Sequence, residues 1–321
     1  MPTTRYPRRG SLQFWPRVRA KRAFARLKTK SRGKETKPDS FAGYKVGMTH
    51  LLITDNRKTS TTKGQPISVP TTVIECPPLK VAGIRFYKNR KVLTQVNAQK
   101  LDKELSRRII LPKKTQKNLN EVEKYDDLSL VVFTQPKLTS IGKKKPELFE
   151  ITLGGSSKED KFNFAKENLG KELKVSDFFK EGEQLDFHSV TKGKGFQGVV
   201  KRIGVKIRQH KSEKTKRGAV LGGEGYGKVE YTAPQSGKMG YHQRTEKNKW
   251  LLKVSDKPTE INPKGGFVNY GLVKNQYILI KGSIPGPKKR LVRFTRALHP
   301  NKKIPSEAPT IEYTSLTSKQ G

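Results

Sequence analysis

A glycine-rich segment has the spacing most often associated with nucleotide chemistry. Residues 193–200 read GKGFQGVV, which matches both the dinucleotide-binding pattern G-x-G-x-x-G and the kinase pattern G-x-G-x-x-G-x-V. A dinucleotide site needs a helix that opens at the third glycine and an acidic residue about 20 positions further on. Gly204 would interrupt such a helix, and the H-R-D and D-F-G motifs of kinases are absent. Two closely spaced lysines, Lys192 just before the segment and Lys194 within it, instead favour the phosphates of a polymer.

The other residues that could do chemistry are scattered along the chain. The five histidines form no H-x-x-x-H pair, and Cys76 is the only cysteine. A zinc site, an intramolecular disulfide and a G-x-S-x-G nucleophile elbow therefore have no support. We predict no catalytic residue, no metal and no cofactor. A single cysteine is typical of a reducing, cytosolic location.

Basic residues give the strongest chemical signal. The 321 residues include 68 Lys or Arg and 28 Asp or Glu, a net charge of +40. Residues 1–40 hold 13 basic and 2 acidic side chains, residues 191–250 hold 15 and 4, and residues 281–303 hold 8 and none. Residues 76–190 hold 23 and 16, which is an ordinary mixed surface. This localised charge predicts a polyanionic partner, and nucleic acid matches it chemically.

Two of the basic segments lack the apolar pattern of folded chain. Residues 1–40 contain few apolar groups beyond Phe14, Trp15 and Phe24, so we predict an arm that is disordered until it meets nucleic acid. A merely solvated tail is the alternative, although aromatic rings beside basic residues suit base stacking. Residues 217–228 follow neither the strand nor the helix period, which predicts a loop or finger.

The segments between these basic regions predict a mainly β fold. Short runs rich in β-branched and aromatic residues, bounded by Gly, Pro or Asn, are typical of strands. They are Tyr44–Asp55, Ile67–Cys76, Val81–Tyr87, Leu128–Thr134, Leu148–Leu153, Phe267–Val273 and Tyr277–Lys281. Helical patterns cover Lys100–Ile110 and Asp160–Leu169, with a short turn at Val175–Lys180 that opens at Ser176 or Asp177. We therefore expect a β-barrel or sandwich that is split by an α/β insertion.

No apolar run approaches the roughly 18–20 residues of a membrane-spanning helix. The basic start of the chain also lacks the apolar core of a secretory signal. We expect neither membrane association nor secretion.

Five blocks of sequence together resemble a known family, the large ribosomal subunit protein three family in its archaeal and eukaryotic form. They read PRRGSL from Pro7, FAGYKVGMTH from Phe41, VTKGKGFQGVVKR from Val190, GYHQRTEKNK from Gly240 and KGSIPGPKKRLVR from Lys281. Each block alone is a short string, but five in the family's order are specific, and the resemblance covers nearly the whole chain.

The resemblance implies a structural protein of the large ribosomal subunit in the cytoplasm, with large-subunit rRNA and neighbouring ribosomal proteins as partners and no small-molecule substrate. It implies binding near the 3′ end of that rRNA, a role in early assembly and a finger that extends towards the peptidyl transferase centre. The fold implied is a closed β-barrel of the translation-protein type, built from residues 41–75 and 180–300. Residues 1–40 would be the extension, 76–179 the insertion, 191–250 the finger and 301–321 a tail.

Carried onto this chain, the resemblance implies a set of RNA-binding residues that are mostly basic. Those of the arm and finger are Arg8, Arg9, Trp15, Arg17, Arg19, Lys192, Gly193, Lys194, Gly195, Lys201, Arg202, Arg208, Arg217, Tyr241, His242 and Arg244. Those of the barrel edge are Lys288, Lys289, Arg290 and Arg293. Glycines such as Gly193, Gly195 and Gly198 would let the backbone approach RNA closely, and Arg would contact two phosphate oxygens at once.

The chain departs from the family pattern at three places. Ile203 stands where the family usually has Trp, so a contact there becomes aliphatic. Near the predicted tip, Glu224 and Tyr226 replace a common Gly-x-Trp context. Lys216 precedes Arg217 where the eukaryotic branch has a histidine, so a modified histidine does not transfer.

Two other functions use the same charge. An architectural DNA-binding protein would need a groove-reading helix, which no segment predicts. An RNA-modifying enzyme would need a cofactor loop or a general base, for which His242 is the residue to test. For the ribosomal protein we expect steep salt dependence. We also expect early proteolysis of residues 1–40 and about 205–240, with protection by RNA.

Overall fold

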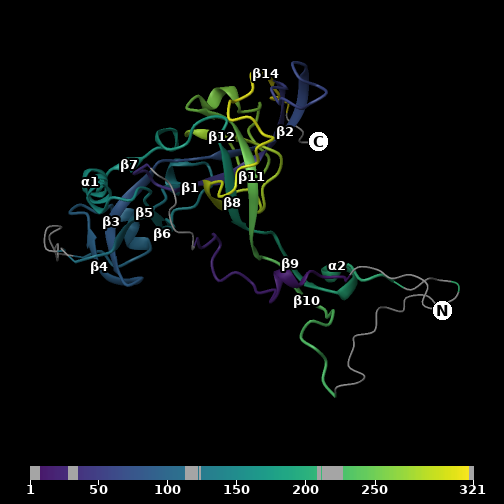
Figure 1. The fold of residues 1–321 in the computed structure, drawn as a ribbon, viewed down its shortest axis with the longest axis horizontal. Coiled ribbons are helices and arrows are strands. Elements are labelled where there is room, and N and C mark those ends of the chain that lie inside the picture. Colours follow the sequence, from purple (N-terminus) through teal and green to yellow (C-terminus); the bar gives the residue numbers. More distant parts are fainter. Residues whose placement is uncertain are drawn as a thin grey trace. The chain divides into compact units, whose positions relative to one another are not determined.

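The computed structural model describes residues 8–27, 35–112, 122, 124–207, 211 and 227–317. The chain divides into two compact units. We call Met1–Ala23 with Val190–Arg244 the ribbon unit, and Phe24–Ser189 with Thr245–Gly321 the sheet unit. The structure as a whole is mainly β, as the sequence predicts, and each unit is described by itself below (Figure 1).

The larger sheet of the sheet unit has seven strands in the order β13-β8-β11-β12-β2-β1-β14. They are β1 Ser40–Thr54, β2 Pro66–Glu75, β8 Gln184–Val190, β11 Gln243–Ser255, β12 Tyr277–Lys281, β13 Leu291–Arg296 and β14 Ile311–Thr314. Strand β13 also pairs with β1, so hydrogen bonding runs around six of the strands and returns to its start.

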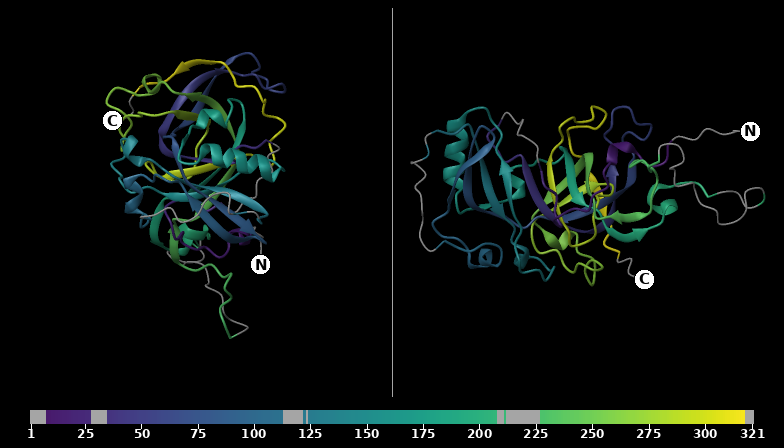
Figure 2. Two further views of the ribbon diagram at one scale, coloured as in Figure 1. Left: turned by 90° about the vertical axis from the view of Figure 1, so that its left-hand side faces the viewer. Right: turned by 90° about the horizontal axis from the view of Figure 1, so that it is seen from below.

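The second sheet has the order β4-β3-β5-β6, with β7 paired to the start of β3. Its strands are β3 Leu79–Lys88, β4 Lys91–Asn97, β5 Asp127–Phe133, β6 Leu148–Thr152 and β7 Glu172–Leu173. Helix α1, Lys158–Asn168, lies against β5 (Figures 1 and 2).

Helix α1 begins and packs for local reasons. The Ser157 hydroxyl accepts the Asp160 amide at 3.3 Å, and Glu159 and Asp160 place negative charge at the positive end of the helix. Phe162 from the helix and Tyr125 lie 6.4 and 4.9 Å, between ring centroids, from Phe86 of β3. This aromatic group fixes the helix on the sheet.

A buried carboxylate organises the loop that leads into β12. Glu75 is fully buried and accepts the amides of Lys274 (2.9 Å) and Asn275 (3.0 Å). The Asn275 side chain (2.7 Å) and the Tyr270 hydroxyl donate to the same carboxylate. Four donors offset the desolvation of the charge, so Glu75 holds this loop in place.

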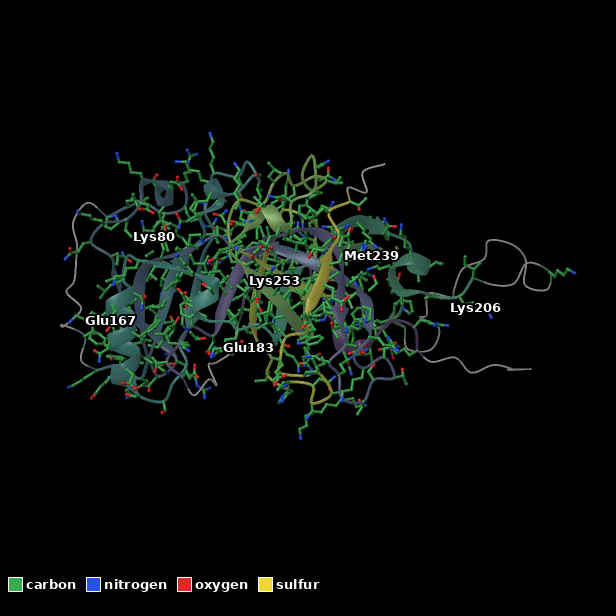
Figure 3. All side chains as sticks on the ribbon, turned by 90° about the horizontal axis from the view of Figure 1, so that it is seen from above. Lys80, Glu167, Glu183, Lys206, Met239 and Lys253 are labelled. Atoms are coloured by element: carbon green, nitrogen blue, oxygen red, sulfur yellow. The ribbon has the colours of Figure 1, made fainter. Side chains whose placement is uncertain are left out.

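In the described part of the sheet unit, several charged side chains pair with an opposite charge. Lys80 contacts Asp102 at 2.8 Å (Lys80 is labelled in Figure 3), and Arg57 donates to Asp55 at 2.8 and 2.7 Å. The Asp55 side chain is buried, and the guanidinium of Arg57 holds the pKa of this carboxyl well below its usual range.

Most of the predicted strands are confirmed. The segments at 44–55, 67–76, 81–87, 128–134 and 148–153 correspond to β1, β2, β3, β5 and β6, and Tyr277–Lys281 is β12. The helix at 160–169 is α1. The turn at 175–180 is a short 3-10 helix that begins at Val175, one residue before the first predicted opening position.

Two predicted elements are wrong. Phe267–Val273 is a tight turn instead of a strand, because Asn269 and Gly271 have φ values of 59° and 105°, and the Tyr270 amide donates to the Phe267 carbonyl at 3.0 Å. Lys100–Ile110 forms only the 3-10 helix Lys103–Arg107. Leu105 is the one residue of that helix that is buried, and the neighbouring Leu101 and Ile109 reach the same small cluster without a full helix.

Candidate nucleic-acid interface

A two-stranded ribbon is the frame of the ribbon unit. Strand β9, Gly193–Gln197, pairs antiparallel with β10, Gly237–Gly240. Gly240 has a φ of 76°, and a Cβ there would lie 2.1 Å from the Lys192 carbonyl oxygen, so only glycine fits. The next residue, Tyr241, has a φ of 55° and donates its amide to the same carbonyl at 3.2 Å. This corner ends the ribbon.

A single helical turn follows β9. Helix α2, Val199–Ile203, opens at the third glycine of the G-x-G-x-x-G segment and ends at Gly204, whose φ is 79°. The sequence predicted that Gly204 would interrupt a helix here, and α2 does end there. Its five residues are too few for a dinucleotide-binding helix. Its Arg202 donates to the backbone carbonyls of Gln235 (2.8 Å) and Lys238 (3.2 Å). Arg202 therefore ties α2 to β10.

The N-terminal arm packs along this ribbon. The Ala20 amide donates to the Tyr241 carbonyl at 2.8 Å, and Arg8 donates to the Thr232 carbonyl at 2.6 Å. At Gly10, with a φ of 80°, an added Cβ would lie 2.7 Å from the Ile203 side chain. The aliphatic residue at position 203 is thus a packing contact for the arm. That residues 1–40 fold only against RNA stays a prediction.

His242 joins the arm to the ribbon. Its ring Nδ1 lies 2.8 Å from the Val18 carbonyl, and its own backbone exchanges hydrogen bonds with Thr191 at 2.9 and 3.1 Å. A carbonyl oxygen only accepts, so Nδ1 carries the proton that the ring donates. The side chain is buried, so His242 helps to hold the arm on the ribbon, and its predicted RNA contact stays a prediction.

Three arginines of this unit lie over aromatic rings. The guanidinium carbon lies 4.7 Å from the Trp15 ring centroid for Arg17, 5.3 Å from that of Tyr241 for Arg19, and 4.8 Å from that of Phe14 for Arg244. Such stacking holds the planar group while its edge remains free to donate.

These elements surround a cavity of about 350 Å³ that we call the basic pocket. Its lining contains five cationic side chains and no carboxylate. The lining residues are Arg17, Thr191, Lys192, Lys194, Arg202, Met239, Gly240, His242 and Arg244. Met239 is labelled in Figure 3.

The electrostatics of the basic pocket are unbalanced. Burial lowers the pKa of Arg17, and the nearby guanidinium groups of Arg202 and Arg244 lower it further. Burial also lowers the pKa of Arg244. Within the described part of the chain, two buried donors of this unit, Nη1 of Arg17 and Nε1 of Trp15, have no hydrogen-bond partner. An anion with several acceptor oxygens in the pocket, such as a phosphodiester, would compensate its positive charge and offer an acceptor to Arg17, which lines it.

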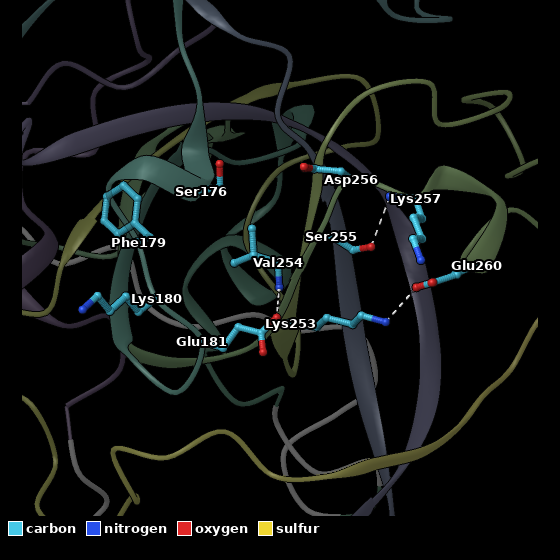
Figure 4. Close-up of a pocket in the computed structure, with 10 residues that line it drawn as sticks. All are labelled: Ser176, Phe179, Lys180, Glu181, Lys253, Val254, Ser255, Asp256, Lys257 and Glu260. Atoms are coloured by element: carbon cyan, nitrogen blue, oxygen red, sulfur yellow. Dashed lines mark hydrogen bonds and ion pairs between the residues drawn. The ribbon is translucent and has the colours of Figure 1, made fainter.

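A second cavity, in the sheet unit, has the opposite character (Figure 4). It has a volume of about 570 Å³, and its lining includes three acidic and three basic side chains. Lys253 pairs with Glu260 at 2.7 Å, and Glu181 accepts the Val254 amide at 2.8 Å (Figure 4). Its charges neutralise one another, so it makes no comparable demand for an anion.

One predicted RNA-binding residue, Arg293, is buried in the sheet unit. Arg293 is 3% exposed on β13, where its guanidinium lies 4.3 Å from the Phe149 ring centroid and donates to the Glu150 carbonyl at 2.7 Å. Burial lowers its pKa to about 9. These contacts place Arg293 in the packing between β13 and β6.

The remaining predicted residues lie in three settings. Lys192, Gly193, Lys194, Gly195 and Lys201 are exposed on the ribbon and α2, and Arg9 is exposed on the arm. In the sheet unit Lys288 donates to the Val268 carbonyl at 2.8 Å, Lys289 is exposed and Arg290 is partly buried. Arg208 and Arg217, together with Lys216, Glu224 and Tyr226, lie outside the described residues.

Sequence reasoning missed two exposed residues of the ribbon, Phe196 and Lys238, which the β9–β10 register places opposite each other. The sequence signal that could have identified Phe196 is its place as the one aromatic residue in the glycine-rich, basic segment 192–198, which reads KGKGFQG. In the described ranges no group of His, Cys, Asp and Glu is arranged to hold a metal ion. Of the helices in the described ranges, none combines the length and apolar character needed to cross a membrane.

Comparison with known proteins gives a consistent result over the full chain. The family model described as Ribosomal protein L3 matches residues 1–321. Large ribosomal subunit protein uL3 of Methanobrevibacter smithii is 47% identical, with 98% of each chain covered. The proteins of that name from Methanocaldococcus jannaschii and Methanosphaera stadtmanae are 45% and 46% identical, again with 98% of each chain covered.

Proposed function

This chain belongs to the ribosomal protein L3 family, and from that premise we propose that its ribbon unit binds large-subunit ribosomal RNA through the basic pocket. The chain is a large-subunit ribosomal protein located in the cytoplasmic ribosome, and its relatives are structural proteins, not enzymes. Membership of the family does not say which surface of the chain binds RNA.

One observation carries the proposal. The basic pocket collects five cations with no carboxylate in its lining, and the buried Nη1 donor of Arg17, which lines it, has no partner in the described structure. Positive charge this concentrated opposes folding unless an anion compensates it. Backbone phosphates are the anions that RNA supplies at regular spacing.

The resemblance extends the proposal to the rest of the chain. We propose that the chain binds near the 3′ end of the large-subunit rRNA, acts early in assembly and contacts neighbouring ribosomal proteins. Residues 191–250 would form the finger that extends towards the peptidyl transferase centre, and residues 1–40 the extension. The ring of pairings through β13, β8, β11, β12, β2 and β1 supports a closed barrel from residues 41–75 and 180–300, with 76–179 inserted and 301–321 as a tail.

No observation in the described structure favours either alternative, an architectural DNA-binding protein or an RNA-modifying enzyme. Helix α2 has five residues, which is too short to read a DNA groove as a recognition helix does. His242, the residue to test for RNA-modifying chemistry, is buried with its Nδ1 donating to Val18.

The experiment is the salt dependence of binding. The full chain is titrated with a large-subunit rRNA transcript and, in parallel, with duplex DNA of equal length between about 50 and 200 mM salt. We expect tighter binding to the rRNA and a loss of affinity of roughly a thousandfold across that range, as counterion release from six or more phosphates requires. Affinity nearly insensitive to salt, or equal affinity for the duplex, would contradict the proposal.

A further inference from the structure

Strand β9 exposes an aromatic ring that nothing in the described structure covers. Phe196 is 72% exposed, although a ring of this size usually contributes to a core. Among the described residues it contacts no other ring and no cation, whereas the arm's Phe14 and Trp15 each lie beneath an arginine. Its exposure is not explained by the packing of the ribbon unit.

The surroundings of Phe196 are basic and open. Lys238 lies directly across the ribbon from it, so the two side chains share one face, and Lys194 lies two residues before it. Both lysines are exposed. Beside the ring, Gly195 has no atom within 4 Å of the position a Cβ would take. The Phe196 ring therefore lies beside backbone that carries no side chain at Gly195, and close in the ribbon to two cationic side chains.

This combination identifies the chemistry of the ligand. A free phosphate would need the cations but not the ring, and an apolar protein surface would need the ring but not the lysines. A base-paired duplex hides the faces of its bases, so it offers only phosphates to this site. An unpaired nucleotide offers both, a base face for the ring and a phosphate for each lysine.

We propose that Phe196 and Lys238 form a stacking platform for one unpaired base of the RNA. The base lies on the Phe196 ring and a flanking phosphate pairs with Lys238. The inference rests on the proposed RNA-binding function and adds that the RNA at this face is a loop, a bulge or a strand end.

The first experiment measures affinity of the full chain for two probes, an unstructured 12-nucleotide single-stranded RNA and a blunt RNA duplex of the same length. Phe196→Leu should weaken single-strand binding by roughly 5- to 100-fold, as loss of one stacked base does, with the salt slope unchanged. Duplex binding should change less than twofold. Phe196→Tyr should bind as the wild type does, and Leu93→Ala on exposed β4 is the control for an apolar surface change.

The second experiment locates the contact. The wild-type chain is bound to a large-subunit rRNA transcript that contains 4-thiouridine, irradiated and digested with trypsin. We expect a crosslink in the peptide of residues 195–201, which holds Phe196, and its loss in Phe196→Leu.

The outcomes separate the two proposals. Strong, salt-dependent binding by the wild type with no effect of Phe196→Leu on the single strand, or equal losses on both probes, would overturn the platform alone. A wild-type chain that binds neither probe in a salt-dependent way would overturn the proposed function itself. Capture of an acidic peptide in place of RNA at this peptide segment would also overturn the platform.

Discussion

The ribbon unit and the sheet unit both contain many Lys and Arg side chains, but these side chains have different partners in the two units. Ten ion pairs of Lys or Arg with Asp or Glu lie in the described part of the sheet unit, from Lys37–Glu35 to Arg296–Glu183. In the described ribbon unit Glu230 is the one carboxylate against fifteen Lys and Arg. There Arg202 donates to backbone carbonyls, and Arg17, Arg19 and Arg244 lie over aromatic rings. These partners hold the side chains in place and carry no negative charge.

The comparison teaches that charge count alone does not identify a binding surface. Arg293 is buried and Arg17 is partly buried. Arg293 contacts Phe149 and the Glu150 carbonyl, whereas Arg17 lines a cavity together with other cations. Stability should therefore depend on the acids of the sheet unit, and RNA affinity on the cations of the ribbon unit. The predictions below test that division in order of expected effect.

The largest effect is expected at Glu75 in the sheet unit. Glu75→Ala leaves four donors of the 270–275 loop without their acceptor, and each unsatisfied buried donor costs roughly 1–3 kcal/mol. The free energy of unfolding, measured by denaturant titration, should fall by at least about 3 kcal/mol. Glu75→Gln retains one acceptor oxygen and should lose less. Unchanged stability in Glu75→Ala would show that the buried carboxylate does not hold the loop.

A smaller effect on folding is expected within the ribbon unit, from a matched pair of glycines. Gly240→Ala puts a Cβ against the Lys192 carbonyl at a positive φ, which should cost about 1–3 kcal/mol and speed amide exchange in β9 and β10. Gly193→Ala meets only Tyr241, at 3.8 Å, so its ribbon should exchange as slowly as the wild type.

The Gly193→Ala variant also tests close approach of the backbone to RNA. If the backbone of β9 at Gly193 lies against RNA, this variant should bind the rRNA transcript more weakly. Its free energy of unfolding should stay within about 0.5 kcal/mol of that of the wild type. Equal RNA affinity would mean that glycine at position 193 serves neither the fold nor the partner.

Much of the sheet unit was predictable because its strands carry their own signal. Tyr277–Lys281 reads YILIK, four apolar residues followed by a lysine, and it is strand β12 with the same bounds. Strands β8, β11, β13 and β14 were missed because charged or polar residues interrupt their apolar pattern, as Arg293 interrupts LVRFTR. A residue pattern cannot show that another strand will cover such a position.

The candidate site was predictable in its members but not in its arrangement. Arg17, Lys192, Lys194, Arg202 and Arg244 were all named from the sequence, and the structure brings them to one pocket. The contact that assembles it, His242 to Val18, joins residues 224 positions apart. No local pattern records a pairing over that distance, and His242 accordingly was expected to face RNA.

The most direct test of the account neutralises two lysines in each cavity and compares the slopes of log affinity against log salt for the rRNA transcript. The ribbon variant is Lys192→Gln with Lys194→Gln, and the sheet variant is Lys180→Gln with Lys257→Gln; all four lysines line a cavity. The account predicts that the ribbon variant loses roughly 1.4–1.8 from the slope, as two lost phosphate contacts require, and that the sheet variant keeps the wild-type slope. Equal slopes in the two variants would contradict it.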